Sequence, residues 1–460
     1  MNYTPDTICA LSTPNGVGAI AMIRLSGSDS FAIMQKMFRK DLGTKDSHTA
    51  HFGLIKDGDK LIDEVVAVIY KNPKSFTGED MVEISCHASP YIIQEILRLL
   101  LQNGARMARE GEFSLRAYLN GKVDLSQAEA IADLIASENK ASHDMAMNQM
   151  RGGFAKVING LREQLIHFAS MIELELDFGE EDVEFANRKD LVELVAKILT
   201  EVRRLSSSFA LGNVLKNGVP VAIVGEPNVG KSTLLNLFLN EDRAIVSNIA
   251  GTTRDVIEDS VTYDGVEFRF IDTAGIRETA DEIESIGIEK AFEKVQQASI
   301  ILYMVDASHP DLDKANSELQ KVRNVMADDK ELIVVINKVD KVSAIDLEQF
   351  KTTLAHDQVV QLSARQAEGL DALKGILVNY VQSQGNATGQ VIVSNARHFN
   401  ALKEAEESLE RVNYSLSNDI PTDLVAMDIR QCLHHLGEIT GNINTEDLLD
   451  SIFSNFCIGK

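Results

Sequence analysis

The nine residues from Gly225 to Thr233, Gly-Glu-Pro-Asn-Val-Gly-Lys-Ser-Thr, constrain the fold of this chain more than any other stretch. The largely apolar run 219–224 before them predicts a strand, and the apolar run 234–239 after them predicts a helix. In a loop between a strand and a helix, backbone N–H groups and the positive end of the helix can together hold a phosphate. We expect Lys231 to reach the β- and γ-phosphates and the Ser232 hydroxyl to bind Mg²⁺. The alternative is a plain strand–turn–helix crossover that matches the pattern by accident.

Residues 216–383 alternate strand and helix patterns, which predicts an α/β domain with a doubly wound parallel sheet. We expect buried strands at 221–224, 268–271, 300–305, 332–336 and 359–362. Besides the phosphate loop, three polar motifs follow these strands in order: Asp272-Thr-Ala-Gly275, Asn337-Lys-Val-Asp340 and Ser363-Ala-Arg365. Such sheets bind ligands at the carboxyl ends of their strands, so the four motifs together predict one nucleotide site. Each motif alone is a weak signal, because an ordinary polar turn at a strand end would look the same.

The motif Asn337-Lys-Val-Asp340 predicts that the base is guanine. A carboxylate at Asp340 can accept from N1–H and from the exocyclic amine of guanine together, and adenine offers no such pair. We expect Asn337 to bond the far edge of the base, the Lys338 stem to pack on the ring, and a backbone N–H of 363–365 to bond O6. The full set expected around the nucleotide is Asn228, Val229, Gly230, Lys231, Ser232, Thr233, Ser247, Thr252, Thr253, Asp272, Thr273, Ala274, Gly275, Asn337, Lys338, Asp340, Ser363, Ala364 and Arg365.

The segment 247–255, Ser-Asn-Ile-Ala-Gly-Thr-Thr-Arg-Asp, lies between the first two motifs. Thr253 is the expected second hydroxyl ligand of Mg²⁺, and Asp272 is expected in the same metal shell. The run Gly-Thr-Thr-Arg-Asp resembles the first switch of the translation-factor-like GTPases, where an asparagine in the phosphate loop accompanies a K⁺ site. The resemblance implies K⁺ ligands at Asn228, Ser247, Ile249 and Thr252. The alternative for Asn228 is a residue that only stabilises its own turn.

Ile276 follows the second motif, and an aliphatic side chain cannot orient an attacking water. If the chain hydrolyses GTP efficiently, another group must position that water. Four acids stand close by in the sequence: Glu278, Asp281, Glu282 and Glu284. Spacing alone does not choose among them, and at least three must simply belong to a solvated switch helix.

A length of 460 residues suggests about three domains. Residues 1–120 mix strand and helix signals and predict a small α+β domain, whereas 121–215 and 384–460 carry apolar residues at helical spacing. Because the last segment is short for a core of its own, we expect it to pack on 121–215. The predicted fold is therefore multidomain, with an α/β P-loop GTPase domain at 216–383 inserted into an α-helical domain and an α+β N-terminal domain before it.

The formal charge of −24 argues against broad, sequence-independent binding of nucleic acid by this chain. The four cysteines, Cys9, Cys86, Cys432 and Cys457, are scattered and form no metal-ligand spacing, which is typical of reduced thiols in a cytosol. The start of the chain has no signal-peptide pattern, and no apolar run approaches the length of a membrane span. We expect a cytoplasmic protein with no membrane segment.

Four further stretches extend the pattern beyond the GTPase motifs: Ser75-Phe-Thr-Gly-Glu-Asp80, Gly111-Glu-Phe-Ser114, Leu125-Ser-Gln-Ala-Glu-Ala-Ile-Ala-Asp133 and Phe456-Cys-Ile-Gly-Lys460. With them the chain resembles, over its whole length, the tRNA modification GTPases of the MnmE (TrmE) type. The resemblance implies a homodimer formed through the N-terminal domain, with G domains that approach each other when GTP, Mg²⁺ and K⁺ are bound. It also implies that Glu284 orients the water through a bridging water, with Arg277 and Arg254 as switch residues.

The same resemblance implies that the N-terminal domain binds a 5-formyl- or methylene-tetrahydrofolate through Arg24, Glu83, Lys122 and Lys460. It implies modification of tRNA at C5 of the wobble uridine (carboxymethylaminomethyl or aminomethyl type) in a hetero-oligomer with an FAD-dependent partner of the GidA/MnmG type. The acidic charge suggests that this partner supplies much of the tRNA affinity. Cys457 could attack the uracil ring or be inert. Two alternatives stay open: a GTP-dependent assembly or signalling switch without modification chemistry, and an N-terminal domain that only dimerises.

Overall fold

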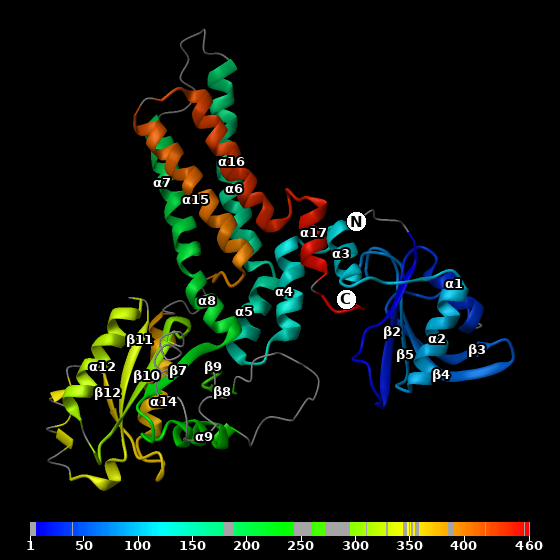
Figure 1. The fold of residues 1–460 in the computed structure, drawn as a ribbon. Helices are drawn as coiled ribbons and strands as arrows, with labels where there is room; N and C mark the ends of the chain where they lie inside the picture. Colours follow the sequence, from blue (N-terminus) through cyan, green and yellow to red (C-terminus); the bar gives the residue numbers. More distant parts are fainter. Residues whose placement is uncertain are drawn as a thin grey trace. The chain divides into compact units, whose positions relative to one another are not determined.

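The structure is a computed structural model that describes the chain except for residues 1–5, 39, 178–187, 243–258, 272–294, 310, 328–329, 344–346, 349, 351–352, 355–357, 385–390, 419, 455 and 460. Figure 1 draws the fold with its helices and strands labelled. The chain divides into two compact units. The first comprises residues 1–136, 146–202 and 400–460, and the second comprises 137–145 and 203–399.

The N-terminal part of the first unit is a six-stranded sheet in the order β3-β4-β5-β2-β1-β6. Helices α1 (Ser30–Phe38) and α2 (Pro90–Gln102) pack on one face of it, where alternate residues of the strands are buried. The strands are β1 (Ile8–Leu11), β2 (Ile20–Ser26), β3 (Thr49–Asp57), β4 (Lys60–Tyr70), β5 (Met81–His87) and β6 (Arg106–Met107). The α+β character predicted for this region is confirmed.

Helix α3 (Glu112–Leu119) lies beyond the sheet and is held by the C-terminal part of the chain. The Tyr118 hydroxyl donates to the Gly441 carbonyl at 2.7 Å, and the Phe453 ring packs near Tyr118 with ring centroids 6.4 Å apart. Gly111 precedes α3 with φ +64°, and a Cβ there would lie 2.5 Å from the Phe453 carbonyl. A glycine is therefore required at this close approach.

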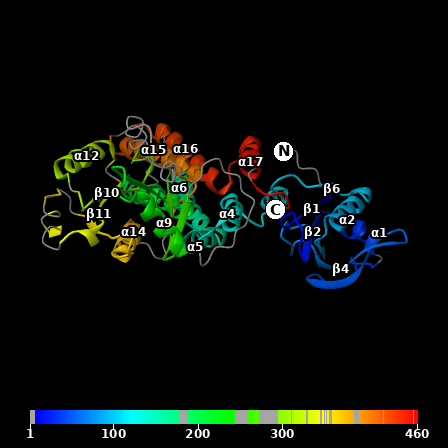
Figure 2. The same cartoon turned by 60° about the horizontal axis from the view of Figure 1, so that its bottom comes forward.

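Long helices make up the rest of the first unit. Helix α16 (Thr422–Thr440) packs along α6 (Gly153–Asp177) and touches α4 (Leu125–Ala136), and α17 (Glu446–Phe453) packs on α3 (Figures 1 and 2). The remaining helices of this group are α5 (Lys140–Met150), α7 (Arg188–Ser207) and α15 (Ala396–Ser417), each of which is shared between the units. Segments on both sides of the α/β domain thus share one unit, which confirms its predicted insertion into a helical domain.

The second unit contains a six-stranded sheet in the order β12-β11-β10-β7-β9-β8. The strands are β7 (Val219–Gly225), β8 (Asp259–Tyr263), β9 (Val266–Phe270), β10 (Ile300–Asp306), β11 (Glu331–Asn337) and β12 (Val359–Gln361). All five predicted strands are present within a residue or two, and they are parallel to one another. The edge strand β8, which sequence reasoning missed, adds an antiparallel pairing with β9.

Helices cover both faces of this second sheet. Helices α9 (Lys231–Asp242) and α14 (Leu370–Gln384) bury apolar residues on one face, and α12 (Leu312–Val325) does so on the other. Helix α8 (Phe209–Asn217) leads into β7, and the short helix η1 (Val339–Lys341) follows β11. Among the described residues, no helix is both long and apolar enough to cross a membrane.

Candidate functional site

The predicted phosphate loop lies between β7 and α9, so its residues occupy the carboxyl end of the central strands. Lys231 is the first residue of α9 and its ammonium group folds back onto the loop. It donates to the carbonyls of Gly225 and Glu226, both at 2.7 Å. Both Nζ bonds hold the side chain over the loop, from which it can turn toward a phosphate. Ser232 stands next to it in the first turn of the helix, where N–H groups point outward.

Asn337 joins three of the four predicted motifs. Its side chain is only 2% exposed, with Nδ2 donating to the Val229 carbonyl at 2.7 Å and Oδ1 accepting from the Ala364 N–H at 3.0 Å. Asn337 was expected to contact the base, but here its amide is engaged with protein groups at both ends. The residue therefore braces the phosphate loop, the turn after β11 and the turn after β12 into one site.

Asp340 and the turn after β12 form the end of this site that was predicted to recognise the base. Asp340 is exposed, and its Oδ1 accepts from the Ser363 hydroxyl at 2.7 Å. The hydroxyl fixes one oxygen and orients the carboxylate. Because the Ala364 N–H already donates to Asn337, the backbone N–H of Arg365 is the next donor in this turn that could meet O6 of guanine.

Lys338 has φ +62° and reaches across to the phosphate loop. Its ammonium donates to the Asn228 carbonyl at 2.8 Å and pairs with Asp306 at 2.5 Å. Burial alone would raise the pKa of Asp306, but the hydrogen bonds from Lys338 and Ser308 outweigh it and lower that pKa. Asp306, at the end of β10, was not predicted from the sequence. Through its pair with Lys338, Asp306 holds the motif 337–340 against the carboxyl end of β10.

Asn228 adopts a left-handed backbone conformation with φ +63° and its side chain is exposed. Asparagine tolerates this region better than other residues with a Cβ. Within the described part of the chain, no hydrogen bond engages the Asn228 side chain. Its amide is thus available to a ligand of the loop.

The remaining predicted residues of the nucleotide site lie outside the described residues. They are Ser247, Ile249, Thr252, Thr253, Arg254, Asp272, Thr273, Ala274, Gly275, Arg277 and Glu284, together with the other three candidate acids Glu278, Asp281 and Glu282.

A second polar site lies on the N-terminal sheet, on the face opposite α1 and α2. Arg24 of β2 and Glu83 of β5 are direct cross-strand partners, and the guanidinium donates twice to Glu83 Oε1, at 2.8 and 3.1 Å. The Tyr70 hydroxyl donates to Glu83 Oε2 at 3.0 Å. Burial and the nearby Glu83 carboxylate raise the pKa of Tyr70, so this hydroxyl remains a donor near neutral pH.

Two aromatic rings support the Arg24 guanidinium. Its central carbon lies 5.1 Å from the Phe76 ring centroid and 5.6 Å from that of Phe113. Rings at this range stabilise a cation through their quadrupoles. Tyr70, Phe76 and Phe113 were not predicted as site residues, although Phe76 and Phe113 belong to two of the family-like stretches.

Lys122 contacts the same loop that carries Phe76. Its ammonium donates to the Pro73 carbonyl at 2.9 Å, and its stem lies beside Gly78. The segment 73–78 therefore touches two of the predicted folate residues, Arg24 and Lys122. The fourth, Lys460, lies outside the described residues.

The C-terminal tail, residues 456–459, reaches the edge of the Arg24–Glu83 site. Ile458 forms an antiparallel bridge with Glu110, and the Gly459 carbonyl accepts from the Ser12 hydroxyl at 3.2 Å and from Arg24 Nη1 at 3.5 Å. Gly459 has φ +93°, and a Cβ there would lie 2.3 Å from the Leu11 carbonyl. Only glycine allows the tail to lie this close to β1.

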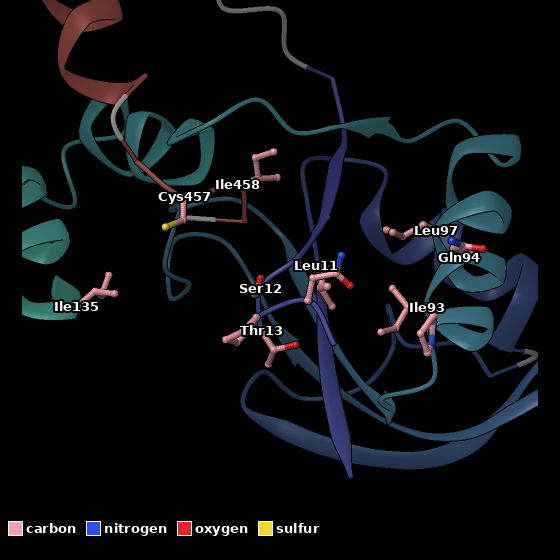
Figure 3. Close-up of a pocket in the computed structure, with 12 residues that line it drawn as sticks. Leu11, Ser12, Thr13, Ile93, Gln94, Leu97, Ile135, Cys457 and Ile458 are labelled. Carbon is pink, nitrogen blue, oxygen red and sulfur yellow. The ribbon is translucent and has the colours of Figure 1, made fainter. Parts of the chain in front are cut away.

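Cys457 is exposed and lines a cavity of about 580 Å³ in the first unit. Figure 3 shows Cys457 and Ile458 on one side of it, residues Leu11, Ser12 and Thr13 in the middle, and α2 on the other side. We call this cavity the tail pocket; its lining is Leu11, Ser12, Thr13, Pro14, Asn15, Pro90, Ile93, Gln94, Leu97, Ile135, Cys457 and Ile458. Among the residues that the structure describes here, the lining has apolar, hydroxyl, amide and thiol groups but no charged side chain.

Comparisons with known proteins cover the whole chain. A profile described as the MnmE helical domain matches residues 125–457, and one described as the GTP-binding protein TrmE N-terminus matches residues 7–122. A tRNA modification GTPase MnmE of Christiangramia forsetii is 55% identical, with 99% of each chain covered. Those of Flavobacterium psychrophilum and Cytophaga hutchinsonii are each 51% identical, covering 99% and 100% of this chain and 99% and 98% of theirs.

A solved structure of the G domain of the T. maritima FeoB iron transporter is 26% identical and covers 36% of this chain and 99% of that one. Its TM-score of 0.26 is too low to add support. The two profiles together span the chain from residue 7 to residue 457, and the full-length relatives agree with them. The chain therefore belongs to the MnmE family of tRNA modification GTPases.

Proposed function

We propose that this chain hydrolyses GTP and uses the hydrolysis cycle to drive modification of tRNA at C5 of the wobble uridine. The observation that carries the proposal is the bracing of three nucleotide motifs by the Asn337 amide, between Val229 and Ala364. A buried amide that fixes loops after β7, β11 and β12 creates a rigid site at the carboxyl edge of the sheet, where such folds bind nucleotides.

Within this site Lys231 and Ser232 hold the phosphates, and Asp340 selects guanine by accepting from two donors on one edge of the base. Mg²⁺ would be held by Ser232, Thr253 and Asp272, and it supplies charge stabilisation between the β- and γ-phosphates. The oxygen donors of these side chains are the kind that Mg²⁺ prefers. Val229, Gly230 and Thr233 complete the loop.

K⁺ is the proposed second cation, held by Asn228, Ser247, Ile249 and Thr252. The Asn228 side chain is exposed and not bonded by any described residue, which fits a ligand role better than a turn-stabilising one. A monovalent cation there supplies positive charge where other GTPases use an arginine. Glu284 is the proposed group that positions the attacking water, with Arg277 acting in the same switch.

The Arg24–Glu83 site is the proposed site for a tetrahydrofolate one-carbon donor, which supplies the carbon for the modification. Glu83 can accept from a pterin N–H edge, while Arg24, Lys122 and Lys460 suit carboxylates. Arg24 has a fork geometry and two supporting rings, and its side chain is 15% exposed. These groups fit a flat, hydrogen-bonding ring with an acidic tail.

The tail pocket is the proposed entry for the uracil ring, with Cys457 as the candidate nucleophile. The described residues that line the pocket carry no charged side chain, and they include the amides of Asn15 and Gln94. Uracil is itself uncharged and carries two carbonyls and one N–H, so amides and hydroxyls can satisfy it. The FAD-dependent partner would complete the hetero-oligomer and supply much of the contact with the tRNA phosphates.

We propose the open face of the N-terminal sheet as the homodimer surface. Strand alternation puts Phe52 and Val66 on the same face as Arg24 and Glu83, and they are 59% and 37% exposed. Exposed apolar residues at neighbouring positions of a sheet are suited to a second copy. Phe52→Asp should therefore shift the chain toward monomer in sedimentation, and an unchanged dimer would exclude this face.

A GTP-dependent assembly switch would share every G-domain residue but would need neither the tail nor the pocket. Deleting residues 457–460 separates the two functions. Loss of the modified wobble uridine with GTP hydrolysis intact supports modification chemistry. Unchanged modification would exclude a role for the tail and favour the switch.

A further inference from the structure

We propose that Arg116 is a positioning residue for the Arg24–Glu83 site, which it shapes without touching a ligand. This inference rests on the proposed folate function of that site. Arg116 lies on α3 and its side chain is 1% exposed, the largest fully buried side chain of the described residues. A guanidinium buried to this degree is costly unless its surroundings are built to hold it.

Three carboxylates from different parts of the first unit surround the Arg116 guanidinium. Nη2 pairs with Asp6 Oδ1 at 2.7 Å and with Glu112 Oε1 at 3.2 Å, and Nη1 donates to both Glu79 oxygens at 3.1 Å. Nη1 also donates to the Asp6 carbonyl at 2.7 Å. Arg116 thus joins the start of the chain, the loop before β5 and α3 at one point.

Glu79 connects Arg116 to β2 and to the rest of the loop 75–80. Its Oε2 accepts from the Ser26 hydroxyl at 2.7 Å, and the Ser75 hydroxyl donates to its carbonyl at 2.6 Å. The Ser26 hydroxyl also lies 2.7 Å from that of Thr77. Ser26 is two residues after Arg24 on β2, so the loop is fixed to the strand that carries Arg24 and on the same face.

The loop and the helix fixed in this way carry both rings that support Arg24. Phe76 belongs to the loop 75–80, and Phe113 lies on α3 three residues before Arg116. Arg116 therefore sets the distance between Phe76 and Phe113, and through them the position of the Arg24 guanidinium. The adjoining residues 73–78 also contact Lys122, so a displaced loop would move two ligand-binding groups together.

The planar fork of arginine is what this arrangement needs. One guanidinium donates to three carboxylates that lie in different directions, which a compact ammonium on a flexible stem cannot do. Arg116→Lys keeps the charge but loses the fork. It should loosen the loop 75–80 without removing any group that touches the ligand.

The test is a double-mutant cycle on the full-length protein, with 5-formyl-tetrahydrofolate as the probe and calorimetry as the readout. We expect Arg116→Lys to weaken binding at least about ten-fold in the wild-type background and less than about three-fold in the Arg24→Lys background, because its effect passes through Arg24. Arg98→Lys is the control for the loss of an arginine fork elsewhere in the same unit. Arg98 also pairs with two carboxylates, Glu95 and Asp57, but on α2 away from the loop.

The outcomes separate the inference from the folate assignment. An equal loss in both backgrounds, or a loss matched by Arg98→Lys, would mean that Arg116 is only structural and would overturn the inference. No binding by the wild-type protein would overturn the folate assignment itself. If Arg116→Lys does not fold, Glu79→Gln takes its place in the cycle, because it weakens the same link from the loop side and leaves Arg116 in place.

Discussion

Gly230 and Asn337 are so close that a Cβ on Gly230 would lie 2.2 Å from the Asn337 amide nitrogen. Gly230 also has φ +106°, a conformation that residues with a Cβ rarely adopt. A glycine is therefore required at position 230 by Asn337, the residue that braces the loop.

Gly230→Ala should weaken GTP binding at least about 100-fold and lower the free energy of unfolding by about 1–3 kcal/mol, because strain and the displaced Asn337 both act on the loop. Nucleotide titration and denaturant unfolding measure the two effects. Gly375→Ala is the control, since Gly375 lies in α14 with no atom within 4 Å of an added Cβ. It should leave binding unchanged and stabilise the chain by about 1 kcal/mol. Equal behaviour of the two variants would contradict the close packing at Gly230.

Asp340→Asn should change base preference from guanine to xanthine. The amide cannot accept from both guanine donors, and two hydrogen bonds to a charged group are worth about 1.5–3 kcal/mol each, so GTP should bind at least about 100-fold more weakly. The new N–H can donate to the extra carbonyl of xanthine, so binding of xanthosine triphosphate should improve. Asp371→Asn is the control, because Asp371 is a fully exposed acid on α14. Retained GTP preference in Asp340→Asn would show that another residue selects the base.

Potassium should stimulate GTP turnover at least about ten-fold over sodium, because a correctly sized cation at Asn228 offsets charge as hydrolysis proceeds. Asn228→Ala should erase this difference. Asn379→Ala replaces another exposed asparagine of the same unit and should preserve it. Equal rates in the two salts with the wild-type protein would rule out the cation site.

Cysteine reactivity should separate Cys457 from the other three thiols. Burial raises the pKa of Cys9 and Cys432 to about 12 and that of Cys86 to about 11, so at pH 8 all three stay protonated and unreactive. Cys457 is exposed. Iodoacetamide at pH 8 should therefore label one thiol in the native wild-type chain and none in native Cys457→Ser. In denaturant it should label all four thiols of the wild-type chain. Rapid labelling of a second native thiol would contradict the buried environments.

Much of the second unit could be predicted because its strands are continuous apolar runs that end in polar motifs. Val221–Val224 and Leu332–Ile336 are buried on both faces, so burial and sequence pattern coincide. Strand β8 was missed because it lies at the edge of the sheet, where only Val261 of its five residues is buried. Strand β3 gives a weak sequence signal for a related reason, because it is an edge strand and contains Gly53, a poor strand former.

The places of Lys231 at the start of α9 and of Asp340 just after β11 could be predicted, because motif spacing fixes them relative to the strands. The role of Asn337 as a brace could not, because it depends on Val229 and Ala364, which are distant in sequence. The same holds for Arg116, whose burial among Asp6, Glu79 and Glu112 arises from three separate segments. Sequence patterns report local period and motif, whereas these contacts depend on how the segments come together.

GTP binding at the nucleotide site should be required for modification of the wobble uridine. The decisive measurement is nucleoside analysis of tRNA from cells that lack this protein, with the wild-type chain or Asp340→Asn supplied back. We expect the C5-modified wobble uridine to disappear in these cells, to return with the wild-type chain and not to return with Asp340→Asn. Unchanged modified uridine in cells without the protein would contradict it.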